Sequence, residues 1–217
     1  MKEKEMLFMM LSGRVDYSGR TPIRAFVLLS VIAVGVWSPD VALAHDEGDG
    51  GAGFAVGLFH PVLGFDHFLA MLSVGIISAQ NCGRAIWYTP LTFVLSMIVG
   101  SILGIRGIGI LSVEAGIAAS VLVLGTILAT ERLFPKWLAV VAVAVFGIFH
   151  GHAHGTEMPL IANPWLYGAG FVTGTAIIHL TGVLIGFGFR RIQLGESALR
   201  VAGASIVAAG AYLLFTL

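Results

Sequence analysis

Long apolar runs dominate this sequence and decide what it can fold into. Runs of about 18 or more apolar residues recur along the chain, and each is long enough to cross a bilayer as a helix. Only 11% of the 217 residues are charged, whereas a soluble domain carries about 25%. The mean hydropathy is +0.94. We therefore expect an all-α, polytopic membrane helix bundle with the lipid bilayer as its solvent.

The polar residues exclude several classes of protein. The formal net charge is zero and no basic patch is present, so nucleic acid is not expected as a partner. The single cysteine, Cys82, permits neither an intrachain disulfide nor a CxxC motif. No G-x4-G-K-[ST] sequence occurs, which argues against an ATP-driven pump built on a P-loop.

The first 44 residues have the pattern of a secretory signal. A basic stretch over residues 1–24 precedes a short apolar stretch at 25–37, and Ala42-Leu43-Ala44 forms an A-x-A cleavage site. We expect residues 1–44 to be a cleaved signal, with an uncleaved anchor as the alternative, and residues 45–217 to be the membrane domain. Cleavage would place His45 at a new N-terminus beside two carboxylates. This segment is either a capture site for a divalent cation or a solvated acidic tail.

Six apolar segments follow, and each is expected to be a transmembrane helix. They span roughly residues 52–80, 85–104, 112–131, 136–153, 164–189 and 197–217. With the mature N-terminus outside, six basic residues fall in inner loops or at inner helix ends, and only Arg106 falls outside, as the positive-inside rule requires. We expect a bacterial inner-membrane protein with both mature termini in the periplasm. Glycines four residues apart predict close helix packing; they are Gly100 with Gly104, Gly170 with Gly174 and Gly182 with Gly186.

Polar residues interrupt the first of these segments. Pro61 removes a backbone hydrogen-bond donor, so we expect the helix to break near Pro61, at about Gly57. His60 and His67 are seven residues apart and would share a face if the helix resumed. An unpaired carboxylate at Asp66, inside the membrane, would cost about 3 kcal/mol. A bound cation, a protonated histidine or proton uptake is therefore expected to compensate it.

A second group of histidines ends the fourth segment, in the sequence His-Gly-His-Ala-His-Gly-Thr-Glu at 150–157. His150 and His154 are four apart and share a helix face, as two ligands of one ion would, whereas His152 points elsewhere unless the chain unwinds. His179 lies deep in the fifth segment. We expect a ladder of sites, whose outer rim holds His150, His152, His154 and Glu157. His60 follows, and then Asp66, His67 and His179.

These ligand types indicate the class of ion. Imidazole and carboxylate suit nickel, cobalt, zinc or iron, and the lack of thiolate disfavours copper(I). Several weak sites in series permit conduction, because one tight site would trap the ion. The predicted metal residues are therefore His45, His60, Asp66, His67, His150, His152, His154, Glu157 and His179.

At these residues the sequence resembles the HupE/UreJ family of membrane proteins. The resemblance rests on the block HPVLGFDHFLAM at 60–71 and the block HGHAHGTE at 150–157, with the signal and six-span layout around them. It implies a secondary permease for nickel or cobalt that feeds hydrogenase or urease maturation. The ion would be cargo and not a permanent cofactor. It also implies that His60, Asp66 and His67 form one signature and that His150, His154 and Glu157 form the other.

Two other functions compete with transport. A membrane-embedded hydrolase would use His67, Asp66 and a further histidine to hold zinc and activate water, but no clear general base is present. The third hypothesis is a metal sensor or chaperone docked to an assembly complex. These ligands do not distinguish nickel from cobalt. The sequence also leaves open whether transport is coupled to protons and whether the protein forms a homo-oligomer.

Overall fold

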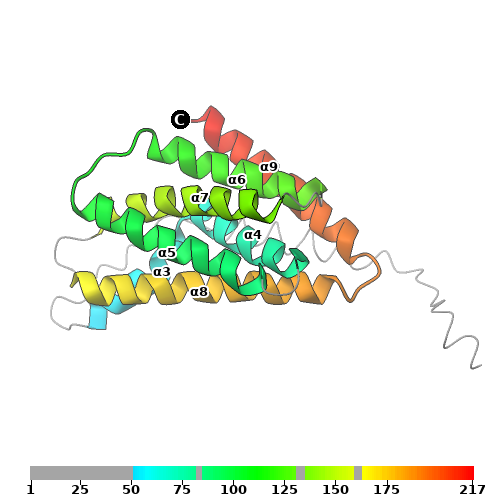
Figure 1. Ribbon diagram of the computed structural model, residues 1–217, viewed down its shortest axis with the longest axis horizontal. Helices are drawn as coiled ribbons and strands as arrows, with labels where there is room; N and C mark the ends of the chain where they lie inside the picture. Colours follow the sequence, from blue (N-terminus) through cyan, green and yellow to red (C-terminus); the bar gives the residue numbers. More distant parts are fainter. Residues whose placement is uncertain (1–50, 82–84, 131–134, 159–162) are drawn as a thin grey trace, which may run out of the picture. The chain divides into compact units, whose positions relative to one another are not determined.

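The computed structural model describes residues 51–81, 85–130, 135–158 and 163–217. The predicted signal and His45 lie outside the described residues. The described chain folds into the helices α3 (Gly51–Leu63), α4 (Phe65–Asn81), α5 (Ala85–Ile105), α6 (Val113–Thr130), α7 (Lys136–Thr156), α8 (Pro164–Phe189) and α9 (Gly195–Phe215) (Figure 1). These bounds lie within a few residues of the predicted segments, and the described residues contain no strand. The all-α membrane bundle is confirmed.

The first predicted span is divided into two helices. α3 and α4 meet at Gly64 with a bend of 81°. Pro61, in the last turn of α3, cannot donate a hydrogen bond to the carbonyl of Gly57, and the helix ends two residues after Pro61. The break near Pro61 is confirmed. Its expected position at Gly57 is wrong, because α3 continues through Gly57, which packs directly on the backbone of Tyr167 in α8.

α8 runs beside both halves of this broken span. The backbone of α3 meets α8 at Gly170 and Gly174, and the backbone of α4 meets it further along, at Gly182 and Gly186. The contacts advance in the same order along both partners, so α3 and α4 run in the direction of α8. Five uninterrupted helices are long and apolar enough to cross a membrane, and the broken pair, counted as one bent span, brings the number to six.

Glycine lines the other close helix contacts as well. Gly100 and Gly104 of α5 lie on the backbone of α7, and α7 presents its own glycines to α5. α5 and α7 run parallel, whereas α6 and α9 form an antiparallel contact, in which Gly125 meets Ile206 and Gly203 meets Ala129. The predicted packing role of glycine is confirmed, because a Cβ atom at these positions would meet neighbouring backbone or Cβ atoms.

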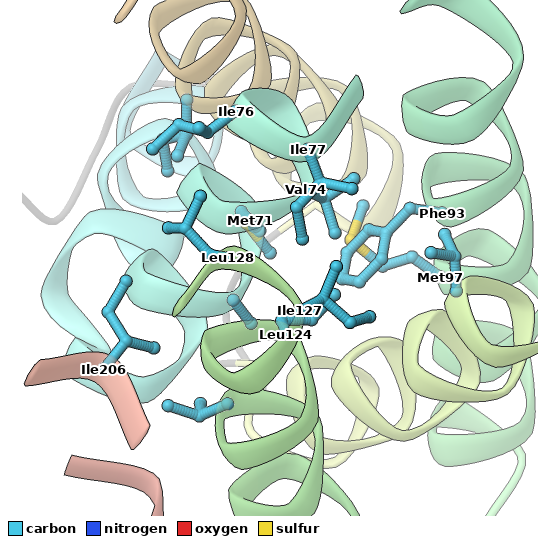
Figure 2. Packing of buried hydrophobic residues seen from close by; sticks show 14 of the residues in the cluster. Met71, Val74, Ile76, Ile77, Phe93, Met97, Leu124, Ile127, Leu128 and Ile206 are labelled. Atoms are coloured by element: carbon cyan, nitrogen blue, oxygen red, sulfur yellow. The ribbon is translucent and has the colours of Figure 1, made fainter. Parts of the chain in front are cut away.

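The apolar core surrounds α4. Figure 2 shows Met71 and Val74 of α4 among Phe93 and Met97 of α5 and Leu124 of α6. α4 also packs on α8, so it has neighbours on several sides and is buried along most of its length. Its first turn, which carries Asp66 and His67, is therefore held inside the bundle.

Candidate metal site

The break at Gly64 places Asp66 and His67 in the first turn of α4. Asp66 Oδ1 accepts hydrogen bonds from the main-chain N–H of His67 and from its ring Nδ1, both at 2.8 Å. A carboxylate is well placed at a helix start, where backbone N–H groups lack partners. Gly64 leaves room for the ring, whose Nδ1 would lie 3.1 Å from a Cβ at that position.

This pair determines which nitrogen of His67 is free. An ionised carboxylate only accepts hydrogen bonds, so Nδ1 carries a proton, and in the neutral imidazole Nε2 is then the nitrogen with the lone pair. Nε2 is buried and has no hydrogen-bond partner in the described part of the chain. A histidine oriented in this way by a carboxylate is a common metal ligand. His67 therefore satisfies Asp66 Oδ1 with two hydrogen bonds, and Asp66 orients His67 to bind a cation through Nε2.

α7 presents His150 and His154 to His67 from one face, as their spacing predicted. The ring of His67 lies 4.6 Å from the ring of His150 and 4.3 Å from that of His154, centroid to centroid. Ser120 donates its only hydroxyl proton to Ile117 and so accepts from His150 Nε2 at 2.8 Å. Nδ1 of His150 is then the free, buried nitrogen.

The exposed end of the cluster joins α3 to α7. His60 Nε2 donates to Glu157 Oε2 at 3.2 Å, and the rings of His60 and His154 are 4.7 Å apart. The ligand atoms of His60, His154 and Glu157 all lie within 4.8 Å of one another. Two atoms bound to one ion at about 2.1 Å are at most about 4.2 Å apart, so small side-chain rotations would bring all three to a single ion.

The cluster has an exposed end at Glu157 and a buried end at His150, although Asp66 keeps 30% of its side chain exposed. The side chain of Glu157 is 57% exposed and that of His60 is 25% exposed, while His154 is 2% exposed and His150 is fully buried. Both nitrogens of His154 lack hydrogen-bond partners among the described residues. Each unsatisfied buried polar group costs about 1–3 kcal/mol. A bound cation would satisfy several of them at once, so this donor set fits a metal ion.

The arrangement differs from the predicted ladder. His60 and His67 do not share a helix face, because the 81° bend separates them; they meet instead around His154. His150 was expected at the outer rim but lies at the buried end of the cluster. The reason is that α7 continues to Thr156, beyond the predicted end at 153, so His150 lies well inside the helix.

Two predicted ligands lie apart from this cluster. His152 contacts the carbonyl of Ile108 through Nε2 at 2.8 Å and so faces the connection between α5 and α6. His179 is buried, and neither of its nitrogens has a partner in the described structure. The ring of Phe93 contacts both His179 and the cluster, at 5.2 Å from His179 and 5.4 Å from His150.

Three residues that border the site or orient its ligands were not predicted from the sequence. Phe171 of α8 contacts His154 at a ring separation of 4.2 Å, and Tyr167, one turn earlier, contacts His60 at 5.8 Å. Ser120, which orients His150, was likewise not marked by any pattern in the sequence. An aromatic or a serine in an apolar span is usually packing, so only the tertiary contacts reveal these roles. Tyr167 alone offered a hint, since a phenol in an apolar span needs a hydrogen-bond partner.

The fold and the cluster define a class: a multi-pass membrane protein with histidines and carboxylates gathered inside its helix bundle. Comparison with known families agrees, since the HupE/UreJ protein family matches residues 37–213. The chain belongs to the HupE/UreJ family, which is linked to nickel and cobalt uptake for hydrogenase and urease. It is 40% identical over 176 residues to Protein HupE of Rhizobium leguminosarum bv. viciae, covering 81% of this chain and 91% of that protein. No solved structure matches the chain.

Proposed function

We propose that the protein is a secondary permease that carries Ni²⁺ or Co²⁺ inward across the bacterial inner membrane, for hydrogenase or urease maturation. One observation carries the proposal. Four imidazoles and two carboxylates from α3, α4 and α7 form one continuous cluster, which leads from the exposed Glu157 to the buried His150. Family membership supports the choice of nickel or cobalt over zinc.

The ion enters at the exposed end of the cluster. Glu157, His60 and His154 capture it, and the metal binds His60 Nε2 as the proton there moves to Nδ1 of a neutral ring or to solvent water from a charged one. The basic residues predicted on the inner side, Arg132 and Lys136, precede or begin α7, whereas Glu157 follows its end, so the positive-inside rule supports a mouth on the outer side. His45 remains a proposed capture group ahead of the mouth.

Transfer proceeds through overlapping pairs of ligands. His154 belongs to the outer group and also contacts His67, so the ion can exchange one ligand at a time without full release. The free nitrogens of His67 and His150 take it next, and His179 follows beyond Phe93. An inside-negative potential favours entry of a divalent ion by about 4–5 kcal/mol per 100 mV, so ATP is not required.

Metal accumulation in cells tests this function. We expect His60→Ala and Asp66→Asn to lower nickel and cobalt uptake by about tenfold or more, as loss of a metal ligand or of its orienting carboxylate commonly does. Glu196→Gln, in an exposed position in the first turn of α9, removes a carboxylate away from the cluster and should keep normal uptake. If both site variants were expressed normally and accumulated metal as well as the unmodified protein, the permease proposal would be wrong.

A further inference from the structure

Tyr167 is a polar residue buried beside the outer end of the cluster. It is 4% exposed, and its hydroxyl has no hydrogen-bond partner in the described part of the chain. Its ring meets that of His60 edge-on at 5.8 Å and stacks on Phe171, which in turn contacts His154. Of the three residues whose ligand atoms converge at the mouth, Tyr167 therefore contacts His60 directly and is linked to His154 through Phe171.

The backbone holds Tyr167 firmly in this place. Asn163 caps the start of α8 by accepting hydrogen bonds from the N–H groups of Trp165 and Leu166, and its carbonyl accepts from the N–H of Tyr167. Gly57 of α3 packs on the carbonyl of Tyr167 from the other side. The ring thus belongs to the rigid wall of the site.

Packing alone does not explain why residue 167 carries a hydroxyl group. Phenylalanine would fill the same space, and it would not leave a buried hydroxyl without a hydrogen bond. A group that is unsatisfied in the metal-free protein is satisfied if its partner arrives with the ligand. Nickel and cobalt ions that are held by few protein atoms retain water molecules in their other coordination positions, and such a water needs a hydrogen-bond acceptor or donor nearby.

We propose that the Tyr167 hydroxyl is an outer-shell hydrogen-bond partner of the hydrated divalent cation at His60, His154 and Glu157, bonding to a metal-bound water or a ligand oxygen. The inference rests on the proposed function, because it requires that this site takes a metal ion. Tyr167 would strengthen capture and help the ion to exchange water for protein ligands. It is a positioning residue and does not need to coordinate the metal itself.

The isosteric variant Tyr167→Phe separates this role from a structural one. The test measures the thermal midpoint of purified, detergent-solubilised protein without metal and then across a titration with Co²⁺ and with Ni²⁺. We expect the metal-free midpoint to stay equal or rise, because an unsatisfied hydroxyl is removed. The metal-dependent shift should shrink, with the apparent affinity reduced about 3- to 10-fold, as the loss of one hydrogen bond implies. Tyr212→Phe, at a site that is 67% exposed, is the matched control and should behave as the unmodified protein.

The outcomes distinguish the two proposals. Opposite effects of Tyr167→Phe on metal-free stability and on metal affinity support the hydroxyl as a metal-site partner. Unchanged affinity, or a parallel loss of stability and affinity, overturns the role of Tyr167 and leaves the permease proposal standing. If the unmodified protein shows no shift with either metal, metal binding itself fails, and the role of Tyr167 fails with it.

Discussion

Replacing His154 by leucine is expected to reduce nickel and cobalt uptake by about 20-fold or more while leaving the fold intact. His154 is the only described side chain whose ring contacts both His60 and His67, so its loss interrupts the cluster between the exposed end and the buried end. Leucine has a similar volume and removes two buried nitrogens that lack partners, so stability should not fall. Uptake and the thermal midpoint, measured on equally expressed protein, check both statements.

His152→Gln is the matched control for this substitution. His152 lies on the same helix, between His150 and His154, but its ring faces Ile108, and glutamine can still donate to that carbonyl. We expect uptake to stay within about twofold of the unmodified protein, because a ring outside the cluster is not a ligand of the ion. Equal losses in His154→Leu and His152→Gln would contradict the path through His154.

Gly151→Ala is expected to destabilise the protein by about 2–3 kcal/mol, although it adds a single methyl group. A Cβ at Gly151 would overlap the backbone carbonyl of Met97, so α5 and α7 would have to separate. No flexible side chain is available to move aside. Since α7 and its C-cap Glu157 carry half of the cluster, uptake should fall together with the thermal midpoint.

Gly168→Ala provides the comparison. Gly168 lies within α8, and no atom approaches within 4 Å of its added Cβ. The same change there should be neutral or slightly stabilising, because alanine favours a helix more than glycine does. The thermal midpoints of the Gly151→Ala and Gly168→Ala variants, measured in detergent, test this difference. Equal midpoints would mean that the α5–α7 contact is looser than the structure shows.

The helix boundaries were predictable from the sequence because the bilayer imposes them. A span must be apolar over about 20 residues, so charged and glycine-rich stretches mark its ends within a few residues. The break near Pro61 followed from the missing amide hydrogen, but its position at Gly64 did not. That position depends on the packing of Gly57 against α8, which is a tertiary contact that no local pattern contains.

The sequence predicted which residues form the candidate site better than it predicted how they are arranged. His60, Asp66, His67, His150, His154 and Glu157 stood out because polar groups are expensive in lipid, and the structure brings all six together. Their order could not be derived, since it depends on how α3, α4 and α7 cross. The displacement of His152 toward Ile108 and the contact of His179 with Phe93 are likewise consequences of packing between helices.

Metal entry into sealed vesicles tests the central claim most directly. Purified protein is reconstituted into liposomes that contain a metal-sensitive dye, and an inside-negative potential is set with potassium and valinomycin. The account predicts saturable entry of Ni²⁺ or Co²⁺ that accelerates with the potential and is lost in Asp66→Asn, where the amide no longer guarantees the free Nε2 of His67. Entry no faster than in protein-free liposomes, or equally fast in Asp66→Asn, would contradict it.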